Sequence, residues 1–286
     1  MFNNLIDEYA KNTMNSHLQD LEEYLQADVI LFYGEIYEDI DSSFKEIVEQ
    51  LQQDKKYKDK CYVILTTVGG SLNPVTRMVS TLRHFYSEVN FIVPDYAYSA
   101  GTIFCMSGDS ILMNYYSVLG PVDPQVQTKD GKLVAALGYL DKINEMIKKS
   151  INDTLSPAEF LILKDFDLAE LRAYEQAQEF AIDLIEKWLF KYKFKDWLHH
   201  SNGSPVTDEE KHDRAKKIAS ELSDNQIWKS HSRGISMNEL MTMKLKIEDY
   251  STDEELSKKI DAYFSIFREY ITKYQINILI HTRRFL

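Results

Sequence analysis

The chain has few of the residues that bend or cross-link a backbone: 10 glycines, 6 prolines and 2 cysteines among 286 residues. Because glycine and proline are scarce, their clusters at Gly69-Gly70 and Gly120-Pro121 indicate positions where the backbone geometry is specified. Cys61 and Cys105 both lie in apolar segments. They are therefore interpreted as reduced core residues and not as a disulfide or a metal pair.

The chain also lacks an excess of positive charge, since 33 basic residues face 45 acidic ones and the formal net charge is −12. An acidic surface repels phosphate backbones, so general nucleic-acid binding is disfavoured. The best basic patch, at 281–284, is interpreted as a solvated tail. No apolar run reaches the roughly 18 residues of a membrane span, and the start has no basic signal-peptide region. The sequence thus predicts a soluble cytoplasmic protein.

What is present is enough apolar material for a packed core, at 44% of the residues. Helical spacing in 2–27 predicts an amphipathic N-terminal helix or helix pair. Beyond it, four apolar runs that read as buried strands alternate with helical patterns, and from about residue 138 the pattern is mainly helical. The strands are expected at 29–33, 61–67, 89–93 and 110–113, and the helices at 42–53, 74–85 and 102–107. Such alternation predicts βαβ units and a largely parallel sheet.

Capping patterns suggest where two of the helices begin. The first is expected to begin at Asp41-Ser42-Ser43, with Glu46 behind these residues as in a capping box. The polar stretch 199–205 is the clearest break in the helical half, and Ser204 or Thr207 with Glu209-Glu210 suggests a new helix after it.

Three short motifs fall at the ends of predicted strands, where parallel α/β sheets place their ligand sites. Thr67-Val68-Gly69-Gly70-Ser71 lets backbone N–H groups approach a ligand, Tyr98-Ser99-Ala100-Gly101-Thr102 exposes a hydroxyl at a strand-to-helix turn, and residues 119–125 form a stiff Pro-Val-Asp-Pro loop around Asp123. Taken singly, the glycine pair is better explained as a tight turn. The serine is also typical of a helix N-cap, and the Asp123 loop of a structural turn.

In this order and spacing, the three motifs together with 228–236 resemble the serine dehydrogenase proteinase (SDH) family, which is related to signal peptide peptidase A and the stomatin-operon protease. The resemblance covers roughly 27–250. It implies a Clp/crotonase-like α/β fold, a ββα-type superhelix around a mainly parallel sheet. Residues 1–26 would then be an N-terminal helical segment and 251–286 a C-terminal helical tail.

Carried onto this chain, the resemblance implies a serine peptidase with Ser99 as the nucleophile. The amides of Gly69 or Gly70 and of Ala100 would form the oxyanion hole, and Asp123 would contact the substrate. No metal or organic cofactor is implied. The pair His199-His200 with His212 lacks the spacing of a zinc site and is interpreted as loop histidines.

The general base is not fixed by the resemblance. Clp proteases carry a histidine one strand after the nucleophile, and 114–120 contains none. Signal-peptide-peptidase relatives use a lysine instead, for which Lys129, Lys132, Lys142, Lys148 and Lys149 are the candidates. A lysine base must be desolvated, and Lys142, which follows an apolar stretch, is expected to be partly buried.

His231 is the other candidate base, because it lies in the last shared motif. The family implies assembly into homo-oligomers and a peptide or unfolded protein as substrate, with no nucleic acid; an unfoldase or membrane partner stays open. Two other functions compete: an inactive scaffold that kept the fold but lost the base, and a crotonase-type enzyme acting on acyl thioesters.

Overall fold

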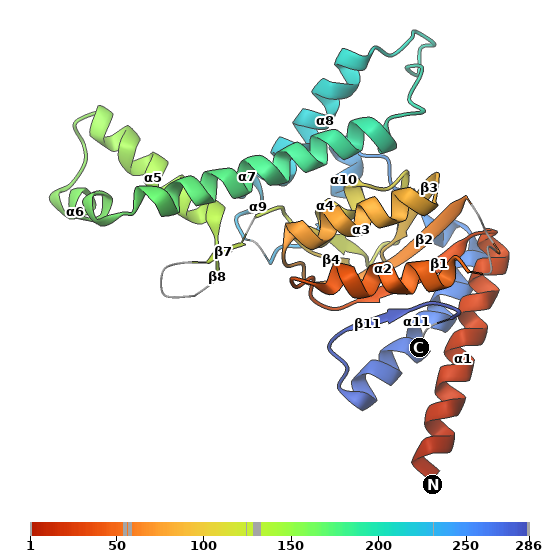
Figure 1. The fold of residues 1–286 in the computed structure, drawn as a ribbon. Helices are drawn as coiled ribbons and strands as arrows, with labels where there is room; N and C mark the ends of the chain where they lie inside the picture. Colours follow the sequence, from red (N-terminus) through yellow and green to blue (C-terminus); the bar gives the residue numbers. More distant parts are fainter. Residues whose placement is uncertain are drawn as a thin grey trace.

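A six-stranded sheet forms the centre of the computed structural model, which describes residues 2–53, 56, 59–123, 125–127, 133–230 and 232–284. The strand order is β10-β5-β3-β2-β1-β11, and every neighbouring pair is parallel except β1 with β11 (Figure 1). The strands are β1 Asp28–Tyr33, β2 Lys60–Thr66, β3 Glu88–Ile92, β5 Ser110–Met113, β10 Glu248–Asp249 and β11 Leu279–His281. The expected mixed α/β fold with a mainly parallel sheet is confirmed.

Two smaller sheets lie beside the main one. Strands β4, β6 and β9 form a three-stranded sheet, and β7 with β8 forms an antiparallel hairpin. These strands are β4 Tyr96–Ala97, β6 Val118–Leu119, β7 Gln125–Gln127, β8 Leu133–Ala135 and β9 Ile235–Ser236. The helices are α1 Phe2–Leu25, α2 Ile40–Leu51, α3 Leu72–Phe85, α4 Ala100–Met106, α5 Ala136–Ile151, α6 Pro157–Asp165, α7 Leu168–Trp188, the π-helix η1 Leu189–Lys193, α8 Asp208–Leu222, α9 Asn225–Trp228, α10 Met237–Thr242, the short 3-10 helix η2 Tyr250–Thr252 and α11 Glu254–Tyr274.

The predicted helix starts are right in one case and wrong in another. Thr207 caps α8 through a capping box with Glu210, as the polar break suggested. Helix α2, in contrast, begins after Asp39, which has a left-handed backbone and makes no side-chain cap. The expected cap at Asp41 is wrong because this carboxylate is buried and its Oδ2 lies 2.9 Å from Arg77 Nε of α3.

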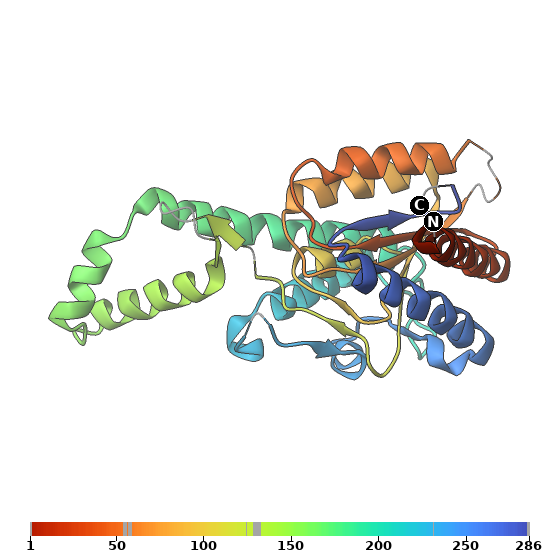
Figure 2. The same ribbon diagram turned by 90° about the horizontal axis from the view of Figure 1, so that it is seen from below.

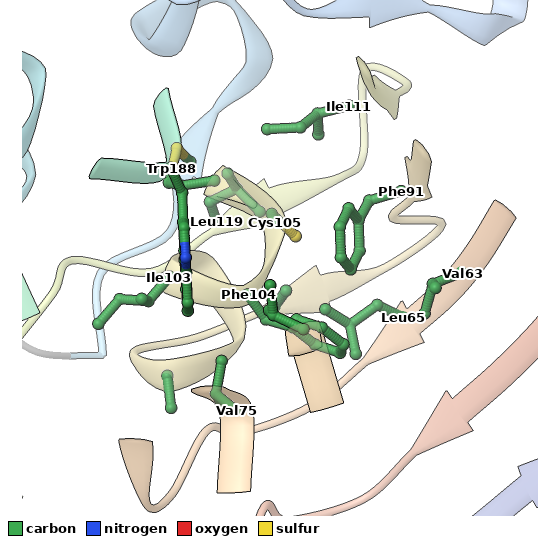
Figure 3. Close-up of a cluster of buried hydrophobic side chains, with 14 of the residues drawn as sticks. Val63, Leu65, Val75, Phe91, Ile103, Phe104, Cys105, Ile111, Leu119 and Trp188 are labelled. Carbon is green, nitrogen blue, oxygen red and sulfur yellow. The ribbon is translucent and has the colours of Figure 1, made fainter. Parts of the chain in front are cut away.

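One face of the sheet carries the larger core, beneath α2, α3, α4, α7 and α8. Every residue of α4 is buried. Figure 3 shows Phe104 and Cys105 of α4 among side chains of the strands, with Trp188 of α7 on the other side of the helix. Both cysteines are free and buried, as expected. Helix α4 is therefore fixed from all sides by apolar packing.

The opposite face is covered by the two ends of the chain. Helices α1 and α11 pack against each other and against the sheet through a second core that includes Leu18, Leu21, Tyr263 and Phe267. The expected C-terminal helix is present as α11, but the segment ends in β11, which joins the sheet beside β1. The division into 1–26, 27–250 and 251–286 stays a prediction.

A buried ion network anchors the C-terminal end. The Arg283 guanidinium lies 2.6 Å from Glu22 and 2.6 Å from Asp28, and both carboxylates are fully buried. Asp28 also accepts hydrogen bonds from Tyr86 (2.8 Å) and Gln52 (3.0 Å). The interpretation of 281–284 as a solvated tail is wrong, because His281 and Thr282 are buried and Arg283 lies against two buried acidic groups.

Helices α5, α6 and the first half of α7 form an arm that projects away from the sheet (Figures 1 and 2). A small cluster of Ala136, Leu137, Leu140 and Tyr174 holds it together. Helix α6 has no buried residue. Its apolar side chains Phe160, Leu161 and Ile162 are instead each more than half exposed. Among the helices of the described ranges, none is long and apolar enough to cross a membrane.

We predict that the free energy of unfolding falls as the pH rises toward neutrality, because Glu22 is protonated in the folded chain. Burial raises the pKa of Glu22 from 4.5 to about 7, although Arg283 opposes this shift. The folded chain therefore holds a proton that the unfolded chain releases, so this stabilisation is complete below pH 4.5 and is lost as the pH rises through about 7. The loss is at most about 3 kcal/mol.

Urea unfolding between pH 4.5 and 7.5 measures this effect. Glu22→Gln should flatten the dependence of unfolding free energy on pH in this interval. The neighbouring Glu23, which is exposed, provides the matched control Glu23→Gln. Equal slopes for Glu22→Gln and the wild type would contradict the assignment.

Candidate active site

The site begins where β2 runs past the end of the main sheet. The Thr67 amide donates to the Tyr96 carbonyl (3.2 Å), and the Tyr98 amide donates to the Thr67 carbonyl (2.9 Å). This short parallel ladder places the Gly69-Gly70 turn after β2 beside the turn that carries Ser99. The sequence predicted both turns at strand ends, and the structure brings them together.

Ser99 lies at the start of α4 in an unusual backbone conformation. Its φ is 51° and its ψ is −114°, outside the regions that non-glycine residues normally occupy. Its side chain does not cap the helix, and no other described group hydrogen-bonds to its hydroxyl. The residue is 6% exposed. A strained backbone of this kind is held by surrounding structure and is frequent at functional sites.

The surrounding contacts that hold this turn involve the rest of the motif. Thr102 Oγ1 donates toward the carbonyls of Ala97 (2.9 Å) and Gly120 (2.8 Å). A side chain at Gly120 would meet Tyr98, because a Cβ there would lie 2.3 Å from Tyr98 Cδ1. The small residues and the threonine of the motif are thus explained by close packing around Ser99.

The glycine pair touches the Ser99 turn directly. A Cβ at Gly69 would lie 2.6 Å from the Tyr98 carbonyl oxygen, 2.9 Å from Ser99 Cβ and 3.2 Å from the Ala100 nitrogen. Gly69 and Gly70 have φ values of 98° and 138°, which glycine adopts most readily. Only glycine therefore permits this approach.

The two glycine amides differ in their partners. The Gly69 amide donates to Thr67 Oγ1 at 3.0 Å. Within the described ranges, the amides of Gly70 and Ala100 have no such partner, and Gly70 lines a cavity together with Ser99. An oxyanion hole needs amides that are free to donate to the developing charge. The geometry therefore favours Gly70 over Gly69 as the donor that accompanies Ala100.

The cavity beside Ser99 has a volume of about 140 Å3 and is mostly apolar. It is enclosed by the N-terminal turn of α3, by α4 and by the middle of α7. Its lining residues are Gly70, Ser71, Leu72, Asn73, Ser99, Ile103, Val122, Ala177 and Phe180. The sequence pattern gave no signal for Ala177 or Phe180, because their position depends on how α7 crosses the core. Of the described residues, no lysine or histidine lines this cavity.

Asp123 lies one residue beyond Val122 and is 4% exposed. Its Oδ1 accepts a hydrogen bond from the Leu137 amide at 3.0 Å, in the first turn of α5. The observed carboxylate thus ties the loop to the start of the arm. Substrate contact by Asp123 stays a prediction.

The candidate bases are distributed differently from the sequence expectation. The expected partial burial of Lys142 is wrong: its side chain is 55% exposed and forms an ion pair with Glu145 at 2.9 Å. The reason is that α5 belongs to the projecting arm. Lys149 donates hydrogen bonds to Glu145 and Glu159, which raises its pKa, the opposite of what a base requires. Lys148 is exposed, and Lys129, Lys132 and His231 lie outside the described residues.

Comparisons of this chain with known proteins identify its family. A family model described as "ClpP-like SDH-type serine proteinase" matches residues 26–201. Among curated proteins, Uncharacterized protein MJ0137 of Methanocaldococcus jannaschii is 30% identical over 173 residues, 57% of this chain and 53% of that protein. Uncharacterized protein MJ1495 of the same organism is 29% identical over 124 residues, 43% of this chain and 38% of that protein. The matched region thus spans about half or less of these relatives.

Solved structures that match this chain include two mutants of the 1510-N membrane-bound stomatin-specific protease, one of them in complex with a substrate peptide. They are 14% identical to this chain, with TM-scores of 0.44 and 0.43. The alignments cover 82% of this chain and 86% and 81% of the two structures. Because the family model spans more than half of the sequence, the chain belongs to the ClpP-like SDH-type serine proteinases.

Proposed function

We propose that this protein hydrolyses peptide bonds through an acyl-enzyme formed on Ser99. The observation that carries the proposal is the contact between the Ser99 turn and the Gly69-Gly70 turn, where a hydroxyl without a hydrogen-bond partner lies beside two free amides. A nucleophile and oxyanion donors in one small, apolar cavity are the parts that acyl transfer requires.

In this mechanism the Ser99 Oγ forms a bond to the substrate carbonyl carbon while a base takes the hydroxyl proton. The carbonyl oxygen becomes an oxyanion and accepts hydrogen bonds from the Gly70 and Ala100 amides. When the C–N bond breaks, the same base returns its proton to the leaving amine. Water then hydrolyses the ester, which releases the acid and restores the Ser99 hydroxyl.

The base in this proposal is one of Lys129, Lys132 and His231. Lys142 is disfavoured because an exposed, ion-paired ammonium does not lose its proton readily near neutral pH. The segment that carries Lys129 and Lys132 follows Val122 of the cavity within about ten residues, and His231 belongs to the last family motif. A lysine in this role requires desolvation, whereas a histidine titrates near neutrality without it.

We predict that a fluorophosphonate probe labels this chain once, on Ser99. Intact-mass spectrometry of the wild type should show a single adduct, which Ser99→Ala should abolish because it removes the attacking oxygen. Ser71→Ala is the matched control, since Ser71 lines the same cavity but its hydroxyl donates to Glu38 at 2.5 Å. A label that survives Ser99→Ala would reject Ser99 as the nucleophile.

The same labelling assay separates the candidate bases. Lys129→Met, Lys132→Met and His231→Ala are compared with Lys142→Met, and loss of labelling in one of the first three identifies the base. Lys142→Met is expected to retain the wild-type labelling rate. If it alone lost labelling, the assignment of the base given above would be wrong.

We also predict that Gly69→Ala lowers the labelling rate by about a hundredfold while the protein remains folded. The added methyl group would overlap the Tyr98 carbonyl oxygen and Ser99 Cβ, so the Ser99 turn must shift. A displacement of about 1 Å at a reacting group can lower the rate by about two orders of magnitude. Labelling rate and the circular dichroism spectrum measure the two properties.

Gly138→Ala is the control for this substitution. Gly138 lies in α5, and a Cβ there would meet nothing within 4 Å. Alanine in a helix is more stable than glycine by about 0.5–1 kcal/mol, so this variant should melt slightly higher and react normally. Wild-type reactivity in Gly69→Ala would show that the close approach is not needed.

We further propose that the arm packs against a second copy of this chain. A helix that is apolar without burying a residue, as α6 is, exposes a patch typical of an interface. Light scattering should then give a mass that is a multiple of 33.4 kDa, and Leu161→Glu should lower it. Lys164→Glu, on the same helix, should leave it unchanged. A monomeric wild type would contradict this proposal.

A second candidate function is an inactive scaffold with the same fold. The observation behind it is that 114–120, where Clp proteases carry their histidine, contains none. A folded and assembled wild-type protein that forms no adduct in the labelling assay would support the scaffold over the peptidase.

A further inference from the structure

A second and larger cavity lies where the parallel strands begin, at the end of the sheet opposite Ser99. Its volume is about 720 Å3, within the usual range for small-molecule sites. Glu88 at the start of β3 and Ser110 at the start of β5 line it, together with η1 and the segment that follows η1. Ser99, in contrast, follows the carboxyl ends of the parallel strands. The two cavities share no lining residue.

The lining of this cavity is strongly cationic, although the chain carries a net charge of −12. Lys193, Arg214, Lys244 and Lys246 face it from three separate segments of the chain. Among the described residues, none of these four side chains has a hydrogen-bond or ion-pair partner. Four unpaired cations that line one cavity repel one another, and a bound anion would reduce this repulsion.

The carboxylates at the cavity do not neutralise these cations, because two of the three are already paired. Asp109 lies 2.5 Å from Lys195 and 2.7 Å from Arg83, and it accepts the Val89 amide at 2.7 Å. Glu88 is paired with Lys60 at 3.1 Å. The third, Asp196, is exposed, and its single charge does not balance four cations.

Lys193 is the strongest sign of a missing partner. It ends the π-helix η1, a rare form that is frequent at functional sites. Burial lowers the pKa of its ammonium group from 10.5 to about 8, although the nearby Glu248 carboxylate opposes this shift. A lysine held in this position without a partner destabilises the fold, so its presence is explained best by a ligand that it contacts.

Aromatic side chains also line this cavity. Phe194 and Trp197 lie edge to face with centroids 5.7 Å apart, and Trp197 is half-buried. The Tyr192 ring is already covered by the Arg83 guanidinium at 3.8 Å. Trp197 and the four cations therefore combine a flat apolar surface with a site for more than one negative charge.

We propose that this cavity binds a small phosphate-bearing molecule with an aromatic ring, such as a nucleoside triphosphate. The phosphates lie among Lys193, Arg214, Lys244 and Lys246, and the ring lies against Trp197. A polyphosphate fits better than a single carboxylate, because four cations call for several negative charges. The proposal is independent of the peptidase activity.

Isothermal titration of the full chain, without divalent cations, tests it. The probes are adenosine triphosphate, guanosine triphosphate, pyrophosphate and adenosine. The triphosphates should bind, pyrophosphate should bind more weakly, and adenosine should give no heat. Lys193→Met and Arg214→Gln should each weaken triphosphate binding by about tenfold or more, since each removes a charged hydrogen-bond donor. Trp197→Leu should reduce the triphosphate affinity to that of pyrophosphate.

Two controls keep the outcome clear. Lys148→Met removes an exposed lysine on the distant arm and should leave binding unchanged. Lys193→Met should melt no lower than the wild type, because it removes an unpaired charge from a half-buried position. The proposal is overturned if no triphosphate binds, if adenosine binds as tightly, or if the folded Lys193 and Arg214 variants bind like the wild type.

Discussion

The backbone of Ser99 is the constraint on which the candidate active site depends. A non-glycine residue at φ 51° and ψ −114° is disfavoured by about 1–3 kcal/mol, so other contacts must hold it there. Those contacts are the Thr67 ladder on one side and the Thr102 hydroxyl on the other. As a result, the Ser99 hydroxyl does not cap α4, and the Ala100 amide is left free. Close packing around this turn explains the small residues beside it, because a Cβ at Gly69 or Gly101 would overlap Ser99 or Thr67.

Helix α4 transmits this constraint into the core. All seven of its residues are buried, and it packs between the sheet and α7. A short helix in such a position cannot rotate or slide without opening cavities around Phe104. The position of Ser99 is therefore set by apolar packing that has no direct part in chemistry. Substitutions in this core can change reactivity through geometry alone, which separates them from substitutions at the site itself.

The sequence predicted features that depend on local pattern and missed those that depend on long-range packing. Ser99 and the glycine pair could be found because parallel strands place such turns at their carboxyl ends. Phe180 could not, since it reaches the cavity only through the path of α7 across the core. Lys142 was expected to be partly buried from its apolar neighbours, but α5 lies on the arm and leaves it exposed. In the sequence, Arg283 belongs to a short basic stretch typical of a solvated tail. In the structure, β11 pairs with β1 and places Arg283 beside Glu22 and Asp28.

Helix α7 links the arm to the candidate active site through a single rigid element. Tyr174 near its start packs in the arm, Phe180 at its middle lines the cavity, and Ile185 near its end lies in the main core. A helix of 21 residues is about 32 Å long and does not bend freely. One wall of the cavity and part of the arm therefore belong to the same helix. Asp123 adds a second connection, because its carboxylate accepts the Leu137 amide at the start of α5. The cavity is thus bounded on one side by α4, which is buried in the core, and on the other by α7, which continues into the arm.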